Sequence, residues 1–153
     1  MEKDTHMKLS TYLRVFLLYA RSDEVAVRRL YHRLLREGAS VWFDRENILP
    51  GQGWEAEIRR AIYNSDIVIV CLSKQFREEG GYRHEELKIA LEKATALPDG
   101  EIFLVPARLE KCDMPEPLCR WQRVDLFEAD GYRRLLKALQ SVLSLSSPKC
   151  KSE

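Results

Sequence analysis

The chain has 153 residues, of which 45% are hydrophobic and 32% are charged, and its formal net charge is +1. This length indicates one domain with a sizeable core, and the balanced charge gives no general attraction to nucleic acid or an anionic membrane. No apolar run approaches the ~20 residues of a membrane span, and no charged-then-apolar leader opens the chain, so we expect a cytoplasmic protein that does not bind membranes.

The four cysteines predict free thiols in a reducing compartment. None pairs with another at CxxC spacing, and the three histidines do not complete a cluster with metal-ligand spacing. We therefore expect neither a disulfide framework nor a metal site.

The first strand is predicted at residues 13–19, a short apolar run. A helix over 25–36 follows, with Ser22 and Asp23 as candidate caps for its start and Gly38 as the glycine that ends it. Its inward face is indicated by four residues at helical spacing: Val27, Leu30, Leu34 and Leu35.

The middle of the chain continues the alternation of strand and helix. Strand 39–43 precedes a Pro/Gly-containing loop at 44–53, which leads into helix 54–63 with Ile58, Ala61 and Ile62 inward. Strand 66–72 is apolar on both faces, which is typical of a central parallel strand.

The remaining segments repeat this order: helix 82–97, turn 98–100, strand 102–105, an irregular stretch at 109–118, strand 121–126 and helix 131–143. Five strands alternating with helices predict a parallel sheet with helices on both faces. Residues 11–144 form this domain. Residues 1–10 are expected to be a disordered start or a cloning scar, and 145–153 a flexible tail or the beginning of a linker.

Right-handed crossovers bring the carboxyl ends of all strands to one edge of such a sheet, where ligands bind. The helix predicted to start at Tyr82 begins at that edge. Its buried stripe is Leu87, Ala90, Leu91 and Ala94. At roughly 100° per residue, Glu86 falls about 40° beyond Ala90, at the border of the stripe, while Glu85 points to solvent. The alternative is that Glu86 only complements the helix dipole.

Four segments in this order resemble the TIR (Toll/interleukin-1 receptor) domain, of the kind common in bacteria. They are Val15-Phe16-Leu17-Leu18-Tyr19, Val41-Trp42-Phe43-Asp44 with Ile48-Leu49-Pro50-Gly51, Ser65 to Ser73, and Tyr82 to Leu87. The resemblance runs from about residue 13 to 143. It implies a flavodoxin-like three-layer α/β/α fold with a five-stranded parallel sheet in the order 2-1-3-4-5.

Catalytic members of this family cleave NAD at the nicotinamide–ribose bond. The resemblance therefore implies that Glu86 is the catalytic glutamate and Tyr82 the substrate-stacking aromatic. NAD would be the substrate and no cofactor would be needed. The products would be nicotinamide with ADP-ribose or a cyclic ADP-ribose isomer, and the cellular role antiviral defence in a bacterium, with a possible fused sensor domain.

Other substrate contacts are implied by the same resemblance. Tyr19, Arg21 and Ser22 correspond to the first-loop contacts. Phe43 and Asp44 are expected to line the nicotinamide pocket, and Ser73 to donate to the ribose. From the residues themselves, Phe43 equally suits core packing, Ser73 equally caps the turn after its strand, and Trp54 is expected to pack rather than to bind.

The loop at 45–53 implies a second role, because in the family it reaches a neighbouring TIR domain. Its assembly residues here would be Ile48, Leu49, Pro50 and Gly51. Contacts of this head-to-tail kind that do not close into a ring give filaments. Ile48 and Leu49 equally suit packing against their own domain.

Two other classes compete with an enzyme. A non-enzymatic TIR adaptor would act only through TIR–TIR contacts, and the aromatic-to-glutamate arrangement argues against it. A receiver domain requires a phosphorylatable Asp after its third strand, where this chain has Cys71-Leu72-Ser73. The sequence also lacks the basic stripe with interleaved aromatic residues that is typical of a nucleic-acid-binding protein.

Overall fold

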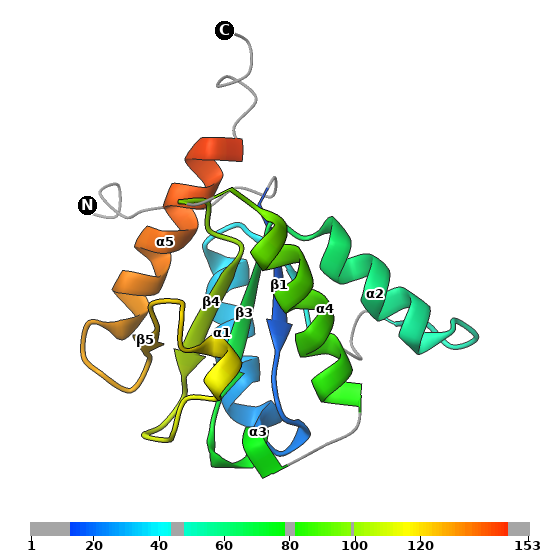
Figure 1. Ribbon diagram of the computed structural model, residues 1–153, viewed down its shortest axis with the longest axis horizontal. Coiled ribbons are helices and arrows are strands. Elements are labelled where there is room, and N and C mark those ends of the chain that lie inside the picture. Colours follow the sequence, from blue (N-terminus) through cyan, green and yellow to red (C-terminus); the bar gives the residue numbers. More distant parts are fainter. Residues whose placement is uncertain (1–12, 44–47, 79–81, 99, 147–153) are drawn as a thin grey trace, which may run out of the picture.

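A computed structural model describes residues 13–43, 48–78, 82–98 and 100–146, which form a sheet between two layers of helices (Figure 1). The strands are β1 (Arg14–Leu18), β2 (Ser40–Trp42), β3 (Ile67–Leu72), β4 (Leu104–Arg108) and β5 (Val124–Asp125). The helices are α1 (Glu24–Arg36), α2 (Trp54–Asn64), α3 (Lys74–Glu78), α4 (Tyr82–Ala96) and α5 (Gly131–Ser146), with short 3-10 turns η2 (Arg21–Asp23) and η4 (Glu116–Leu118).

The five strands pair in the order β2-β1-β3-β4-β5, and every pairing is parallel. The predicted flavodoxin-like fold and strand order are confirmed. All six residues of the central strand β3 are buried, as its continuous apolar run predicted.

The two faces of the sheet hold separate core clusters, because successive side chains of a strand point to opposite faces. On one face Leu17 and Ile69 pack with residues of α1 and α5. On the other face Phe16 and Val68 pack with residues of α2 and α4. Figure 1 shows α4 in front of the sheet and α1 behind it.

Helix α1 ends as predicted, since Gly38 follows it with a φ of 102°, which favours glycine. Its inward face is narrower than predicted. Val27, Leu30 and Leu34 are buried, but Leu35 is 40% exposed. Leu35 lies about 100° around the helix from Leu34, beyond the width that the sheet covers.

Strand β4 runs through Pro106, where the sequence predicted an end at Val105. The Leu109 N–H donates to the Leu72 carbonyl of β3. Because the backbone nitrogens of successive strand residues point alternately to the two neighbouring strands, the nitrogen of Pro106, three residues earlier, faces β5. Pairing with β5 begins only at Ala107, and a missing N–H is tolerated where no ladder bond is required.

Strand β5 is shorter than the predicted 121–126, because it pairs only with the last two residues of β4. The turn after it brings Gly131 so close that a Cβ there would meet the Asp125 carbonyl oxygen at 2.0 Å. Helix α3 was not predicted, since five residues are too few for a helical period to show.

Residues 1–10, 44–47 and 147–153, for which the sequence also gave predictions, lie outside the described residues. Within the described ranges, no group of His, Cys, Asp and Glu is arranged to hold a metal ion. No helix in those ranges combines the length and apolar character required to cross a membrane. Cys71, Cys112 and Cys119 are free thiols.

Candidate active site

Glu86 is buried, with only 3% of its surface exposed, and it lines a cavity of about 230 Å³ between α2 and α4. We refer to this space as the Glu86 cavity. Its lining comprises Trp54, Glu55, Ile58 and Arg59 from α2 and Glu85, Glu86 and Ile89 from α4. A carboxylate taken out of water is costly, and such groups in clefts are candidates for functional sites.

The burial of Glu86 follows from the packing of α4. Leu87, Ile89 and Ala90 are buried in the core cluster on the α2 side, so the neighbouring Glu86 is also on the inward side of the helix. Glu85 is exposed, as its helical phase predicted. Glu86 lies deeper than the predicted border of the stripe because α2 covers that border.

The opposite wall of the cavity belongs to α2, and the sequence did not assign its residues to a site. Trp54 is the first residue of α2 and is 44% exposed, although it was expected to pack. Trp54 and Ile58 are one helical turn apart and share a face of α2, and Arg59 follows about 100° further around the helix, still on the cavity wall. That spacing, on the helix after the loop at 44–53, is a signal that sequence reasoning missed.

The cavity is predominantly acidic, since three of its lining residues are glutamates and one is an arginine. Such a site favours a ligand that carries a positive charge near the carboxylates. Glu86 and Glu85 lie on the α4 wall, whereas Arg59 and the third glutamate, Glu55, lie on the α2 wall.

The remaining predicted substrate residues of the ligand edge are only partly described. Tyr82 is the first residue of α4, one turn before Glu86, and its side chain lies outside the described part, as does all of Asp44. Arg21 and Ser22 are exposed in the turn η2, directly after β1. They lie at the carboxyl ends of the strands, the edge where ligands bind in this topology.

Tyr19 and Phe43 are 4% and 1% exposed and belong to the core. Their rings stack with centroids 5.2 Å apart, and Tyr31 continues the stack at 4.7 Å from Phe43. The guanidinium of Arg28 lies 5.0 Å from the centre of the Phe43 ring. This stack is in the cluster on the α1 side, so the structure does not bring it into the Glu86 cavity.

Ser73 is 2% exposed and lies immediately after β3. Its hydroxyl donates to the Asp23 carboxylate and accepts the N–H of Phe76 at 3.2 Å. Asp23 occupies the N-cap position of α1 but makes no capping bond with its side chain, which corrects the predicted cap. The Ser73–Asp23 bond instead joins the turn after β1 to the end of β3.

The two large apolar residues of the predicted assembly loop differ in their exposure. Ile48 is half-buried and packs with the core cluster on the α2 side, whereas Leu49 is 65% exposed. The Leu49 N–H donates to the side-chain oxygen of Gln52 at 2.8 Å, and Gly51 has a φ of 94°. This hydrogen bond and the positive φ of Gly51 form a compact turn on which Leu49 is exposed.

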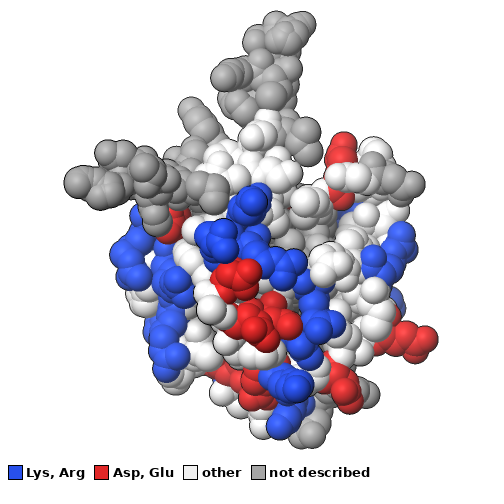
Figure 2. All heavy atoms as spheres, turned by 90° about the vertical axis from the view of Figure 1, so that its left-hand side faces the viewer, with Lys and Arg blue, Asp and Glu red and all other residues white. Residues whose placement is uncertain are grey.

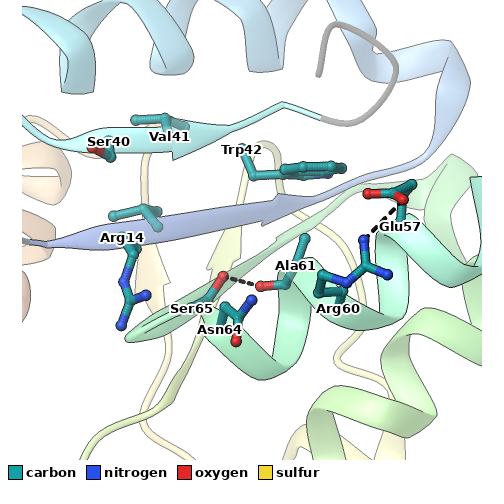
Figure 3. Close-up of a pocket in the computed structure, with 10 residues that line it drawn as sticks. Arg14, Ser40, Val41, Trp42, Glu57, Arg60, Ala61, Asn64 and Ser65 are labelled. Atoms are coloured by element: carbon teal, nitrogen blue, oxygen red, sulfur yellow. Dashed lines mark hydrogen bonds and ion pairs between the residues drawn. The ribbon is translucent and has the colours of Figure 1, made fainter. Parts of the chain in front are cut away.

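A second cavity of about 350 Å³ lies between β2 and α2, and Figure 3 shows ten of its lining residues. We refer to it as the edge cavity. It extends from Arg14 at the start of β1 to Trp42 and to the Glu57–Arg60 ion pair, whose atoms are 2.8 Å apart. It runs from the amino ends of β1 and β3 to the last residue of β2, and it shares no lining residue with the Glu86 cavity, although α2 is a wall of both.

The carboxyl ends of β4 and β5 carry an ion pair of their own. The Arg108 guanidinium donates to both Asp125 oxygens at 2.7 and 2.9 Å and to the Cys112 carbonyl at 2.7 Å. Hydrogen bonds from Arg108 and Arg123 lower the pKa of Asp125 to about 2. On the face of the molecule that carries β5 and α5, acidic groups lie among the basic ones (Figure 2).

The topology and the Glu86 cavity define a flavodoxin-like α/β domain with a buried carboxylate at its ligand edge. The family model of the TIR domain matches residues 15–136, and the chain belongs to this family. The TIR domain of the Toll-related receptor TRR-2 from Hydra magnipapillata is similar, with 24% identity and a TM-score of 0.68, over 82% of this chain and 97% of that one.

Two further proteins are similar to this chain. The CMP N-glycosidase BcmB of Clostridium botulinum has a TM-score of 0.52 at 19% identity, over 81% of this chain and 97% of that one. The uncharacterised protein y4cD of Sinorhizobium fredii (strain NBRC 101917 / NGR234) is 28% identical over 110 residues, 71% of this chain. The match spans only 17% of y4cD.

Proposed function

We propose that this TIR domain is an N-glycosidase that cleaves NAD at the nicotinamide–ribose bond, with Glu86 as its catalytic carboxylate. The observation that carries the proposal is the burial of Glu86 in an acidic cavity at the ligand edge of the sheet. The fold similarity to a CMP N-glycosidase supports the same class of bond, since both reactions break a carbon–nitrogen glycosidic bond.

The chemistry requires little of the protein beyond a well-placed negative charge. The nicotinamide of NAD is cationic and leaves as a neutral molecule, so the leaving group needs no proton. The ribose passes through a transition state that resembles an oxocarbenium ion. A carboxylate at the position of Glu86 would stabilise that developing charge and accept hydrogen bonds from the ribose hydroxyls.

The fate of the ribose carbon depends on what attacks it. Water would give ADP-ribose, whereas attack by a nucleophile of the same molecule would give a cyclic isomer. We propose that Tyr82, one turn before Glu86, stacks on the substrate and influences this choice. Arg21 and Ser22 would add contacts from the turn after β1.

The domain is further proposed to act in the cytoplasm as an effector of bacterial antiviral defence, activated by self-assembly. The exposed Leu49 supports the assembly role. The small share of y4cD that this chain matches supports a TIR domain that works as one part of a longer protein, for example beside a sensor domain.

A non-enzymatic adaptor is the second candidate, and Leu49 is the observation that favours it. An adaptor requires an exposed contact surface but no buried carboxylate. The two candidates therefore differ in what they predict for Glu86.

The test is product analysis by mass spectrometry after incubating NAD with concentrated or artificially clustered protein. We expect release of nicotinamide and a loss of at least about 100-fold in rate for Glu86→Gln, the order of magnitude for removing a key electrostatic group. The matched control is Glu92→Gln, which makes the same change at an exposed position of the same helix outside the cavity. Full turnover by Glu86→Gln would refute the assignment, and association without any turnover would favour the adaptor.

A further inference from the structure

We propose that α2 recognises the substrate of the Glu86 cavity: Trp54 stacks on its cationic ring and Arg59 binds its phosphate, so that the site selects a nucleotide over the corresponding nucleoside. The inference rests on the proposed N-glycosidase function and extends it. It assigns substrate selection to a helix whose residues were expected only to pack.

The first element is the position of Trp54. It is 44% exposed at the start of α2, where it lines the same cavity as Glu86. The core residues Phe16 and Phe43 are each only 1% exposed, whereas Trp54 belongs to neither core cluster. An indole face beside an acidic cavity is suited to a planar cation, through stacking and cation–π attraction.

The second element is the contrast between two consecutive arginines. Arg60 faces the edge cavity and pairs with Glu57 at 2.8 Å, as Figure 3 shows. Arg59 lines the Glu86 cavity and makes no ion pair within the part of the chain that the structure describes. A guanidinium presents several donors in a plane and binds phosphate oxygens in pairs.

The third element is the position of the cavity's one arginine. Glu86 and Glu85 lie on the α4 wall, whereas Arg59 lies on the α2 wall together with Glu55. A ligand that is positive at one end and negative at the other suits this arrangement. The nicotinamide mononucleotide half of NAD has a cationic ring, a ribose and a phosphate in that order.

The size of the cavity indicates how much of the ligand it can hold. Its volume of about 230 Å³ is below the roughly 300–1,000 Å³ that holds a whole drug-sized ligand. The cavity therefore takes one half of a dinucleotide, and we assign it to the nicotinamide half, because Glu86 must reach the ribose on that side.

The experiment compares cleavage of NAD with cleavage of nicotinamide riboside, which has the cationic ring and ribose but no phosphate. For Arg59→Gln we expect the KM for NAD to rise about tenfold or more and the KM for the riboside to change less than about twofold. For Trp54→Ala we expect kcat/KM to fall for both substrates, with recovery in Trp54→Phe, which retains a ring.

Two control variants change the same helix outside this cavity. Arg60→Gln removes the neighbouring guanidinium that faces the edge cavity, and Tyr63→Ala removes a ring that is 48% exposed. Both are expected to retain the kinetics of the unchanged protein. An equal loss in Arg59→Gln and Arg60→Gln, or an equal effect of Arg59→Gln on both substrates, would overturn the assignment of Arg59.

Binding of nicotinamide mononucleotide and nicotinamide riboside, followed by NMR titration of the unchanged protein and Arg59→Gln, separates this inference from the proposed function. Binding of the mononucleotide that depends on Arg59, without any cleavage of NAD, would support recognition by α2 and reject the N-glycosidase. Cleavage of NAD that is indifferent to Trp54 and Arg59 would reject only the role of α2. Absence of both binding and cleavage would reject both proposals.

Discussion

Ser73 donates the hydrogen of its hydroxyl to the Asp23 carboxylate, across 50 positions of the chain. The bond joins the end of β3 to η2, the turn directly before α1. It therefore fixes η2, the turn that places Arg21 and Ser22 at the ligand edge. This buried serine links two loops, and its expected contact with the substrate stays a prediction.

Ser73→Ala is predicted to lower the free energy of unfolding by about 1–3 kcal/mol, because it removes a buried hydroxyl that both donates and accepts a hydrogen bond. Urea denaturation measures the change. A double-mutant cycle with Asp23→Ala, which removes the acceptor, should give a coupling energy of at least about 0.5 kcal/mol. Strictly additive effects would show that the two side chains do not act together.

The Arg108–Asp125 pair predicts a dependence of stability on acid pH. The pKa of Asp125 is lowered from 3.8 to about 2 by hydrogen bonds from Arg108 and Arg123. A carboxyl whose pKa is lower in the folded state stabilises that state above its unfolded pKa and loses this contribution as pH falls toward the folded value. The pair should therefore contribute fully above about pH 4 and progressively less down to pH 2.

Thermal unfolding at several pH values between 2 and 6 checks this prediction. Asp125→Asn should lower stability at pH 6 by on the order of 1 kcal/mol and reduce the difference between pH 6 and pH 2. Asp130→Asn, at an exposed position in the following turn, is the control and should leave that difference unchanged. An unaltered pH profile in Asp125→Asn would mean that other carboxyls account for acid sensitivity.

Lys93 connects the two walls of the Glu86 cavity. Its ammonium, on α4, donates to the carbonyls of Tyr63 and Ser65 at the end of α2, at 2.6 and 3.2 Å. It also lies 4.5 Å from the centre of the Phe103 ring. Burial lowers the pKa of Lys93, yet three contacts with carbonyl oxygens and a ring favour its charged form.

Lys93→Ala is predicted to destabilise the domain by about 1–3 kcal/mol, since it leaves the carbonyls at the end of α2 without their charged donor. It should also raise the KM for NAD, because the separation of α2 and α4 sets the shape of the cavity. Lys88→Ala changes an exposed lysine of the same helix and should do neither. Calorimetry and steady-state kinetics on both variants measure the two effects.

The parallel sheet with helices was predictable because the hydrophobic period changes between strands and helices, whereas the strand order came from the resemblance to the TIR family. The inward position of Glu86 was predictable because Glu85 and Glu86 have distinct helical phases. The sequence did not predict β4 beyond Val105, since whether Pro106 interrupts the strand depends on which side its nitrogen faces. It did not predict the contact between Ser73 and Asp23, or the shared cavity of Trp54 and Glu86. Those contacts depend on how separate elements pack, which no local pattern contains.

The loop after β2 gives the last prediction, and the structure decides which residue tests it. Ile48 packs with the core, so a charge there would disturb the fold as well as any contact between domains. Leu49 is 65% exposed, so Leu49→Glu should leave the fold intact. If assembly uses this loop, Leu49→Glu should abolish concentration-dependent association in light scattering and lower NAD cleavage at high protein concentration. Val25→Glu, at a 71% exposed position at the start of α1, adds the same charge elsewhere and should do neither, whereas equal behaviour of the two variants would place the contact outside this loop.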